Sequence, residues 1–414
     1  MSLRNALIVF FSAFMLIAYT NCGKSGFEDA LLLDSKFVTT NASAGKALPI
    51  IGDEPNIVEI TVGCGYINEP CVSVTLCEPG TSTCQTIPNV LLDTGSYGLR
   101  LFSSVVTLNL ASKMAGAGTL TECMGYADGS SQWGPVKTAD VVLGKRKAAS
   151  VPIQIIDSTF GSLPKTCTNP DVSPKSVGFN GILGIGVFAE DCGPGCAAIT
   201  NNKLYFSCSG ASCANTVVPV ANQVTNPVAM MTVDNNGVAL QFPNVPEAGA
   251  TALKGWLVLG IGTQTNNTPD EVNVFPADSN GYFQTVFNGK LYNSSFIDSG
   301  SNGLFFPGSS VLNACAETSF ASGFFCPPVN SNLTAIQLGK NGTPAVSVNF
   351  QIQNAEVALA VSNPNIVFNN LGGNSPDLIS GSFDWGLPFY FGRTIFHAFE
   401  KKTTPIGTGP YFAW

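Results

Sequence analysis

The chain has 414 residues, a net charge of -8 at pH 7 and a pI of about 4.7, and only 11% of its residues are charged. This acidic balance excludes the basic surface with which nucleic-acid-binding domains meet phosphate. Its 43 glycines and 26 prolines indicate many turns, and its length is ample for two lobes of ordinary domain size.

The chain opens with a segment typical of export. Arg4 gives it a basic start, and residues 6–18 form an uncharged, mostly apolar run that is too short to span a membrane. Cys22 follows where a bacterial lipoprotein carries its lipid-modified cysteine, so we expect residues 1–21 to be a lipoprotein signal peptide and Cys22 to be lipidated. Because residues 19–21 depart from the usual sequence before that cysteine, ordinary secretion, with Cys22 part of the leader, is the alternative.

Residues 22–50 are small, polar and irregular, which is typical of a flexible tether. Beyond the tether, short runs rich in Val, Ile, Thr and Phe predict β-strands over residues 57–62, 72–76, 90–92, 139–143 and 151–156. Helix signals are few: the best covers residues 310–317, after a serine cap, and a second short helix is expected within residues 216–232. The sequence therefore predicts an all-β fold with a few short helices.

Two similar stretches stand out in the two halves of the chain. Residues 90–96 read Val-Leu-Leu-Asp-Thr-Gly-Ser, and residues 296–301 read Phe-Ile-Asp-Ser-Gly-Ser. The pattern predicts a strand that ends in a tight turn, in which glycine permits the bend and two hydroxyls hold the carboxylate. Two such turns facing each other bring Asp93 and Asp298 together.

At these residues the chain resembles the pepsin-like aspartic proteases, whose two lobes each contribute one such turn. Other motifs follow in the family's order: residues 126–130 are similar to its flap hairpin, residues 179–185 to a first-lobe glycine motif, and residues 383–389 with 395–400 to the closing motif of the second lobe. The resemblance spans most of the chain from about residue 57. Residues 298–306 also resemble a signature of uncharacterised bacterial secreted proteins and lipoproteins.

The resemblance implies a bilobal, pepsin-like acid protease fold. Residues 51–248 then form the N-terminal lobe with Asp93 and the flap, and residues 249–414 form the C-terminal lobe with Asp298, with the boundary between Pro243 and Gly255. It also implies catalytic roles for both aspartates. The remaining expected site residues support the dyad or form the flap: Thr94, Gly95, Ser96, Ser299, Gly300 and Ser301 for the dyad, and Tyr126, Gly129 and Ser130 for the flap.

The implied activity is that of an aspartic endopeptidase. One water shared by Asp93 and Asp298 attacks the peptide bond, with one carboxyl ionised and the other carrying a proton. The expected substrate is a peptide or protein that lies extended beneath the flap, and no cofactor or metal is expected.

Three departures from the family pattern bear on that activity. Arg100 stands where many members have a tryptophan that hydrogen-bonds the flap tyrosine, so Tyr126 takes a different position or Arg100 selects acidic side chains. Asp384 occupies a normally apolar place and could disturb the pKa values of the dyad. The cysteine-rich insert at residues 64–84 could cover or extend the cleft.

Cysteine parity agrees with the export signal. The chain has 13 cysteines, and without Cys22 the other 12 can form six disulfides, which their clustering predicts to be mostly local. The four cysteines within residues 192–213 also fit a zinc site, but an oxidising compartment favours disulfides.

Other enzyme classes are poorly supported. The single histidine, His397, lies in an apolar run without a serine elbow, so we expect a core residue rather than a catalyst. The alternatives to a protease are a catalytically silent pepsin-fold binding or inhibitor protein on the cell envelope, two merely structural turns, and an adhesion module. Because both aspartate turns are intact, we expect an enzyme. We also expect a monomer that binds no nucleic acid and is anchored through Cys22 to a membrane of the bacterial envelope, facing the periplasm or the surface.

Overall fold

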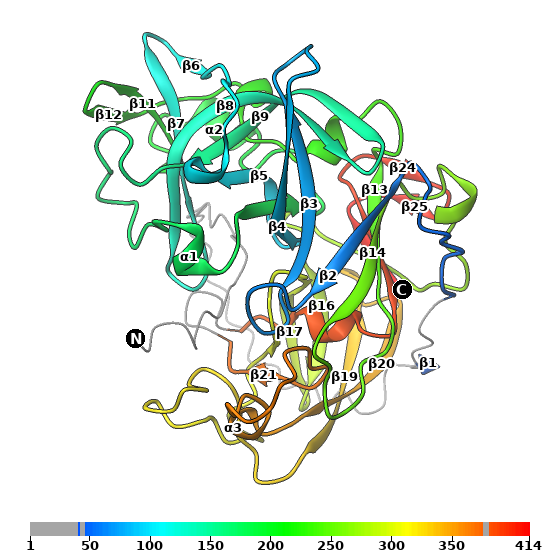
Figure 1. Ribbon diagram of the computed structural model, residues 1–414. Coiled ribbons are helices and arrows are strands. Elements are labelled where there is room, and N and C mark those ends of the chain that lie inside the picture. Colours follow the sequence, from blue (N-terminus) through cyan, green and yellow to red (C-terminus); the bar gives the residue numbers. More distant parts are fainter. Residues whose placement is uncertain (1–39, 42–45, 376–380) are drawn as a thin grey trace, which may run out of the picture.

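The computed structural model describes residues 40–41, 46–375 and 381–414 (Figure 1). β-Strands dominate this part of the chain, and they assemble into a large sheet, a second sheet and a two-stranded ribbon of β24 (Thr403–Thr404) and β25 (Gly407–Thr408). Helices are confined to single turns. They are α1 (Pro174–Val177), α2 (Pro194–Ala198), α3 (Ala355–Ala358), η2 (Ser103–Val105), η3 (Val220–Asn222), η4 (Pro227–Met230), η5 (Thr265–Asn267) and η7 (Leu387–Tyr390).

The N-terminal lobe is built on the first part of the large sheet, which runs in the order β12-β11-β7-β8-β9-β5-β10-β4-β3 with β6 paired to β7. In chain order these strands are β3 (Pro70–Cys77), β4 (Cys84–Asp93), β5 (Tyr97–Phe102), β6 (Met114–Ala115), β7 (Gly118–Gly125), β8 (Ser131–Leu143), β9 (Arg146–Ile156), β10 (Gly181–Ile185), β11 (Tyr205–Ser209) and β12 (Ser212–Asn215). All five residues of β10 are buried, because that strand lies centrally between β4 and β5.

The large sheet continues through strands that come from both halves of the sequence. Its order there is β2 (Ile57–Val62), β14 (Leu253–Leu259), β13 (Gly237–Gln241), β23 (Thr394–Ala398), β26 (Tyr411–Ala413) and β15 (Val274–Pro276). Apolar residues of these strands join the main hydrophobic core, which also receives residues from both lobes. The lobes are therefore held together by a shared sheet and a continuous core.

The second sheet belongs to the C-terminal lobe, which lies below the first in Figure 1. Its order is β1 (Thr40–Asn41), β20 (Ala345–Ile352), β19 (Ser331–Leu338), β16 (Phe283–Phe287), β17 (Lys290–Ile297), β22 (Asp384–Trp385), β18 (Leu304–Phe305) and β21 (Gly372–Gly373). Its core is rich in aromatic rings, such as Phe306 and Phe383, which stack with their centroids 4.9 Å apart. Trp385 stacks on Phe383 in turn, at 4.4 Å.

The all-β, two-lobed pepsin-like fold predicted from the sequence is confirmed, and each of the five predicted strands lies within an observed one. The predicted helix at residues 310–317 is wrong. Those residues form turns and an isolated bridge, because Cys315 is tied to Cys326 and Ala314 pairs with Phe325. The helix expected within residues 216–232 is replaced by two 3-10 turns, η3 and η4.

Six disulfides form within the described residues, as the cysteine parity predicted. The four cysteines of the alternative zinc site are paired as Cys192–Cys196 and Cys208–Cys213. This many disulfides is typical of a protein that folds in an oxidising compartment after export. No helix among the described residues is long and apolar enough to cross a membrane. The signal peptide, Cys22 and most of the tether lie outside the described residues and stay predictions, as do the exact lobe boundaries.

Candidate active site

The first aspartate turn closes the end of β4. Residues 90–92 are buried between the flanking strands β3 and β10, so the strand carries Asp93 into the interior, where it is 1% exposed. The backbone N–H of Gly95 donates to Oδ1 of Asp93 at 2.8 Å, and the Ser96 hydroxyl donates to Oδ2. Two short-range donors thus fix the orientation of this carboxylate.

The second turn follows β17 and repeats the first. The Gly300 N–H donates to Oδ1 of Asp298 at 2.8 Å, and the Ser301 hydroxyl donates to Oδ2 at 2.8 Å. Asp298 is 0% exposed. The two carboxylates are therefore held by equivalent atoms of equivalent residues.

Hydrogen bonds between Thr94 and Ser299 join the two turns across the lobes. The backbone N–H of each residue donates to the hydroxyl of the other, at 3.1 Å from Thr94 and 2.9 Å from Ser299. The hydroxyls donate in turn across the junction, Ser299 to the Leu92 carbonyl at 2.7 Å and Thr94 to the Ile297 carbonyl at 3.3 Å. Asp93 directly precedes Thr94, and Asp298 directly precedes Ser299. The two aspartates therefore lie on either side of the junction that these hydrogen bonds form between the lobes.

The electrostatic environment places both aspartates near the same neighbours. Burial raises the pKa of Tyr97 well above its ordinary value, and the charges of Tyr282, Asp93 and Asp298 raise it further. Burial also raises the pKa of Tyr390, and both aspartates add to that shift. Asp93 and Asp298 together therefore raise the pKa of a tyrosine in each lobe, Tyr97 in the first and Tyr390 in the second.

A buried polar chain extends behind Thr94. The Tyr390 hydroxyl lies 2.8 Å from the Thr94 hydroxyl and 3.0 Å from Nε2 of His397. Burial lowers the pKa of His397 to about 3, so the imidazole is neutral at any ordinary pH. His397 is thus a buried residue of β23 that supports the junction through Tyr390.

The predicted flap is a hairpin between β7 and β8. Its turn is closed by hydrogen bonds from the Tyr126 N–H to the Ser130 carbonyl at 2.9 Å and from the Gly129 N–H to the Tyr126 carbonyl at 3.0 Å. Gly129 has a φ of +85°, which glycine adopts without strain. Ala127, next to Tyr126, packs in an apolar cluster with Phe296 and other residues of the second lobe, so the flap spans both lobes.

Tyr126 itself is buried at 5% exposure and points into a polar network of the first lobe. Its hydroxyl donates to Oε1 of Gln132 at 2.7 Å, and the Gln132 amide donates to Asp171 at 3.1 Å. Burial raises the pKa of Asp171 to about 7. The hydroxyl of the flap tyrosine therefore has a glutamine partner within the first lobe.

Arg100 does not face a substrate, which excludes the expectation that it selects acidic side chains. It is 0% exposed, and one terminal nitrogen donates to Glu122 at 2.8 Å and to Asp191 at 2.9 Å. The Tyr205 hydroxyl also donates to Asp191, at 2.8 Å. Burial raises the pKa of Asp191 well above its ordinary value and the Glu122 charge adds to this, while Arg100 opposes it.

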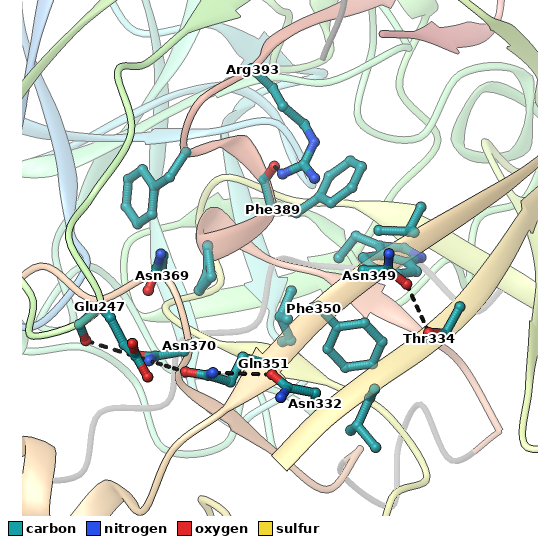
Figure 2. A pocket seen from close by; sticks show the side chains of 16 residues that line it. Glu247, Asn332, Thr334, Asn349, Phe350, Gln351, Asn369, Asn370, Phe389 and Arg393 are labelled. Carbon is teal, nitrogen blue, oxygen red and sulfur yellow. Dashed lines mark hydrogen bonds between the residues drawn. The ribbon is translucent and has the colours of Figure 1, made fainter. Parts of the chain in front are cut away.

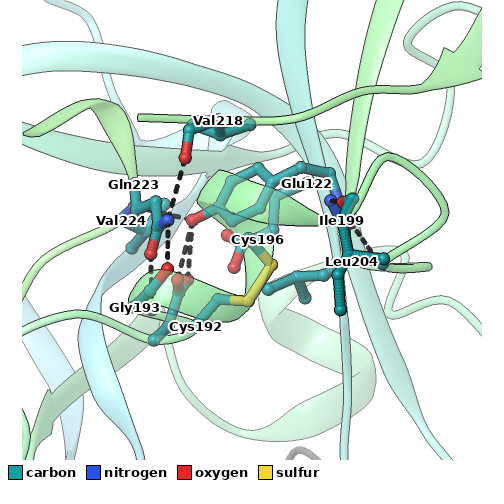
Figure 3. Close-up of a disulfide and its surroundings, with 12 residues drawn as sticks. Glu122, Cys192, Gly193, Cys196, Ile199, Leu204, Val218, Gln223 and Val224 are labelled. Carbon is teal, nitrogen blue, oxygen red and sulfur yellow. Dashed lines mark hydrogen bonds between the residues drawn. A yellow bond between two sulfur atoms is a disulfide. The ribbon is translucent and has the colours of Figure 1, made fainter. Parts of the chain in front are cut away.

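The Cys192–Cys196 disulfide (Figure 3) closes a short loop directly after Asp191. In the same region, the Gln223 side chain accepts from the Gly193 N–H at 2.7 Å and donates to the Gly193 carbonyl at 2.8 Å. The disulfide and the Gln223 hydrogen bonds hold the residues after Asp191 in place, and Asp191 pairs with Arg100. We therefore assign Arg100 a structural role.

Asp384 occupies the place that Ile182 has in the first lobe. Leu91 pairs with Ile182 two residues before Asp93, and Phe296 pairs with Asp384 two residues before Asp298. The Asp384 carboxylate is fully buried, and neither oxygen has a hydrogen-bond partner among the described residues. Burial raises its pKa well above the ordinary value, and the charge of Asp298 adds to this shift.

The insert before the first turn links the lobes beside the second turn. Asn68, in the loop closed by Cys64 and Cys71, donates through Nδ2 to the Asn302 carbonyl at 2.8 Å and the Phe368 carbonyl at 2.9 Å. Its side-chain oxygen accepts from the Phe368 N–H at 2.7 Å. Since Asn302 follows Ser301 directly, this loop contacts the second lobe next to the second aspartate turn.

Metal-ligating residues cluster at one place in the described part of the chain, at Cys64, Glu69 and Cys71. Both sulfurs are in the disulfide, so only the Glu69 carboxylate is left as a ligand. Burial raises the pKa of Glu69 to about 8, against the hydrogen bonds from the Tyr66 and Gly65 backbone. A single carboxyl that keeps its proton near neutral pH is a poor metal site.

Sequence reasoning missed the residues that support the site from a distance. Tyr390 lies within the closing motif but carries no local signal of its contact with Thr94, which is 296 residues away. The partners of Arg100, Glu122 and Asp191, are 22 and 91 residues away in the chain. Only the unusual charge at position 100 itself was visible in the sequence.

Three comparisons place the chain among known proteins. The profile of the family described as "Protein of unknown function (DUF3443)" matches residues 52–414. No curated protein matches the chain. Among solved structures, the crystal structure of an aspartic proteinase from Irpex lacteus is similar, with 16% sequence identity and a TM-score of 0.47, over 86% of this chain and 96% of that chain.

Proposed function

The chain belongs to the family of proteins of unknown function DUF3443, and we propose that this member is an aspartic endopeptidase. The observation that carries the proposal is the matched pair of turns, in which equivalent donors hold Asp93 and Asp298 and reciprocal hydrogen bonds join Thr94 to Ser299. A merely structural turn has no need of a second, oppositely placed copy with the same carboxylate contacts.

The proposed reaction is general acid–base hydrolysis through one shared water. Two carboxylates at one junction cannot both ionise cheaply, so the pair holds a single proton over an acidic range. The ionised member takes a proton from the water as it attacks the peptide carbonyl, and the protonated member donates to the carbonyl oxygen. Gly95, Ser96, Gly300 and Ser301 keep both carboxylates oriented for these transfers.

The proposed substrate is a peptide or protein segment in extended conformation. It lies beneath the flap turn of Tyr126, Gly129 and Ser130, whose closure excludes water from the reacting groups. Because Ala127 packs on the second lobe in this structure, the flap has to lift before a substrate enters. We also propose that the enzyme acts as a monomer, held at the bacterial envelope by lipid on Cys22.

Peptide-library digestion tests the activity. The protein from Lys24 onward is incubated with the library from acidic to neutral pH, beside the Asp93→Asn variant. We expect cleavage with a bell-shaped pH profile, loss of cleavage in the variant, and inhibition by a statine-type compound whose hydroxyl occupies the place of the water. No cleavage by folded wild-type protein across the library, or undiminished cleavage by Asp93→Asn, contradicts the proposal.

The second candidate is a catalytically silent binding or inhibitor protein of the same fold. Burial of the site favours it, since both aspartates are buried and both Asn68 and Ala127 contact residues of the second lobe. In that case Asp93→Asn leaves partner binding intact and no peptide is cut at any pH. Mass spectrometry of the native protein tests the anchor separately: Cys22 should be the first residue and carry lipid.

A further inference from the structure

A pocket lies mainly in the C-terminal lobe (Figure 2), and no residue of the aspartate turns lines it. Its volume is about 600 Å³, which suits a disaccharide-sized ligand. The lining comes from β18, β19, β20, β22 and η7, from the segment after η7 that carries Arg393, and from the loops around Glu247 and Asn369. It includes none of the residues assigned to the dyad or the flap. A ligand here is therefore bound independently of the proposed catalytic site.

Arg393 supplies a positive charge without an acidic partner among the described residues. Its NH1 donates to the Phe389 carbonyl at 2.8 Å, and the guanidinium stacks on Phe389 and Trp414, 4.6 Å and 5.6 Å from the ring centroids. The Nε atom is buried and has no hydrogen-bond partner. Burial lowers the pKa of Arg393 to about 10, so the group stays charged at neutral pH. A fixed, uncompensated guanidinium is suited to a carboxylate.

Uncharged amides make up most of the polar lining. Asn349 accepts from the Thr334 hydroxyl at 2.8 Å, and Gln351 donates to Asn332 and accepts from Asn370, both at 3.1 Å. The Asn369 side-chain oxygen is buried without a hydrogen-bond partner, while its amide donates to the Val245 carbonyl. These links hold the amides in place, and the free atoms offer both donors and acceptors, which hydroxyl groups can satisfy together.

Aromatic side chains complete the pocket. Phe350, Trp385 and Phe389 line it, and Phe350 is partly exposed. Aromatic faces pack against the apolar C–H face of a sugar ring while amides bind its hydroxyls. Glu247, the single acid of the lining, lies on the opposite side of the pocket from Arg393 (Figure 2), and it already accepts a hydrogen bond from Asn330 at 2.7 Å.

We propose that this pocket binds an acidic saccharide, with its carboxylate on Arg393, its hydroxyls on the amides of Asn349 and Asn369, and a ring face on Phe350. The combination carries the assignment, because a neutral sugar leaves Arg393 unpaired and a simple anion leaves the amides unused. The site is separate from the dyad, so the inference does not depend on peptidase activity.

Isothermal titration calorimetry with digalacturonic acid tests the proposal on the protein from Lys24 onward. Wild-type protein should bind, and the methyl ester of the same disaccharide, which keeps the hydroxyls and loses the charge, should bind roughly tenfold to hundredfold more weakly. Arg393→Gln should lose a similar factor. Lys290→Gln removes a positive charge from the same lobe outside the pocket and should bind like wild type.

Two further variants keep the test decisive. Asn369→Asp adds a negative charge to the lining and should abolish binding, even if Arg393→Gln fails to fold as judged by its Tm. Asp93→Asn should bind as wild type does. The proposal is overturned if wild-type protein ignores digalacturonic acid at millimolar concentration, if the ester binds equally well, or if a short peptide with a free carboxyl terminus binds better than the sugar.

Discussion

The two aspartate turns are alike in their own hydrogen bonds but differ in what stands behind them. In the first lobe Ile182 packs in an apolar cluster next to β4, whereas in the second lobe its equivalent is Asp384, a buried carboxyl. The comparison teaches that short-range contacts within four residues are sufficient to shape each turn. The backing residues are therefore free to differ, and they affect charge and stability rather than the position of the two aspartates.

The two lobes also differ in whether their buried acidic groups are paired with a cation. The first lobe encloses a cation, Arg100, between Glu122 and Asp191, while the second lobe leaves Asp384 without a positive partner among the described residues. The hydrogen-bonded chain of Thr94, Tyr390 and His397 is also joined to the first turn, because it starts at Thr94. Substitutions of the two aspartates test what the turns have in common, and substitutions of Arg100, Asp384 and Tyr390 test how their surroundings differ.

The largest effect is expected where the two turns are equivalent. Asp93→Asn and Asp298→Asn should each lower kcat/KM for peptide cleavage by about 10³-fold or more, because either change removes one half of a single acid–base unit. The double variant should cost little beyond either single one. Steady-state kinetics on one peptide substrate measures all three, and multiplicative losses would show two independent carboxylates.

Arg100→Met should destabilise the first lobe by about 3–5 kcal/mol, because Glu122 and Asp191 stay buried without their cation. Chemical denaturation measures the free energy of unfolding. Arg146→Met is the matched control: Arg146 is partly exposed and Asp234 keeps its bond from Thr263, so a smaller loss is expected. Equal losses at the two positions contradict the structural role given to the buried network.

Asp384→Asn should stabilise the protein, and the gain should grow with pH. The pKa of Asp384 is raised in the folded chain above its ordinary value of 3.8, so the unfolded chain releases this proton first. Wild-type stability therefore falls above about pH 3.8, by about 1.4 kcal/mol per pH unit from this group, until the folded pKa is passed.

Measuring the free energy of unfolding of wild type and Asp384→Asn from pH 3 to pH 8 tests this linkage. The two curves should converge at the acid end and separate towards neutral pH. Asp384→Ile, which copies the first lobe, should behave in the same direction. A constant difference at every pH would mean that Asp384 titrates normally.

The smallest effect is expected from Tyr390→Phe, which removes the hydroxyl between Thr94 and His397. The loss should be about 0.5–1.5 kcal/mol, as for one buried neutral hydrogen bond. Because His397 is neutral with a pKa of about 3, this loss should be constant between pH 5 and pH 8. A marked pH dependence in that range would show that the imidazole is charged.

The parts of the site that sequence analysis predicted are those encoded locally. Glycine and hydroxyl residues within three positions of Asp93 and Asp298 make the carboxylate contacts, so their pattern was visible in the sequence. The strands were predictable for a similar reason, since runs such as residues 57–62 carry their own pattern of burial. Thr94 and Ser299 were expected to support the dyad only through the family resemblance.

The parts that were missed depend on contacts distant in sequence. Residues 310–317 have a helical pattern, yet the Cys315–Cys326 disulfide and the pairing of Ala314 with Phe325 override it. The pocket around Arg393 gathers amides from two strands and one loop, and no single segment signals it. The role of Arg100 was misjudged because its acidic partners lie elsewhere in the chain.

The disulfide pattern has a consequence for how the chain matures. In each of the six pairs the bonded cysteines are consecutive, with no other cysteine between them, even for Cys123 and Cys167, which are 44 residues apart. As the chain emerges from its amino end, the first thiol that each new cysteine meets unpaired is its native partner. Cys22 is the one thiol that could break this order, and both fates expected for it, lipidation or removal with the leader, take it out of the count.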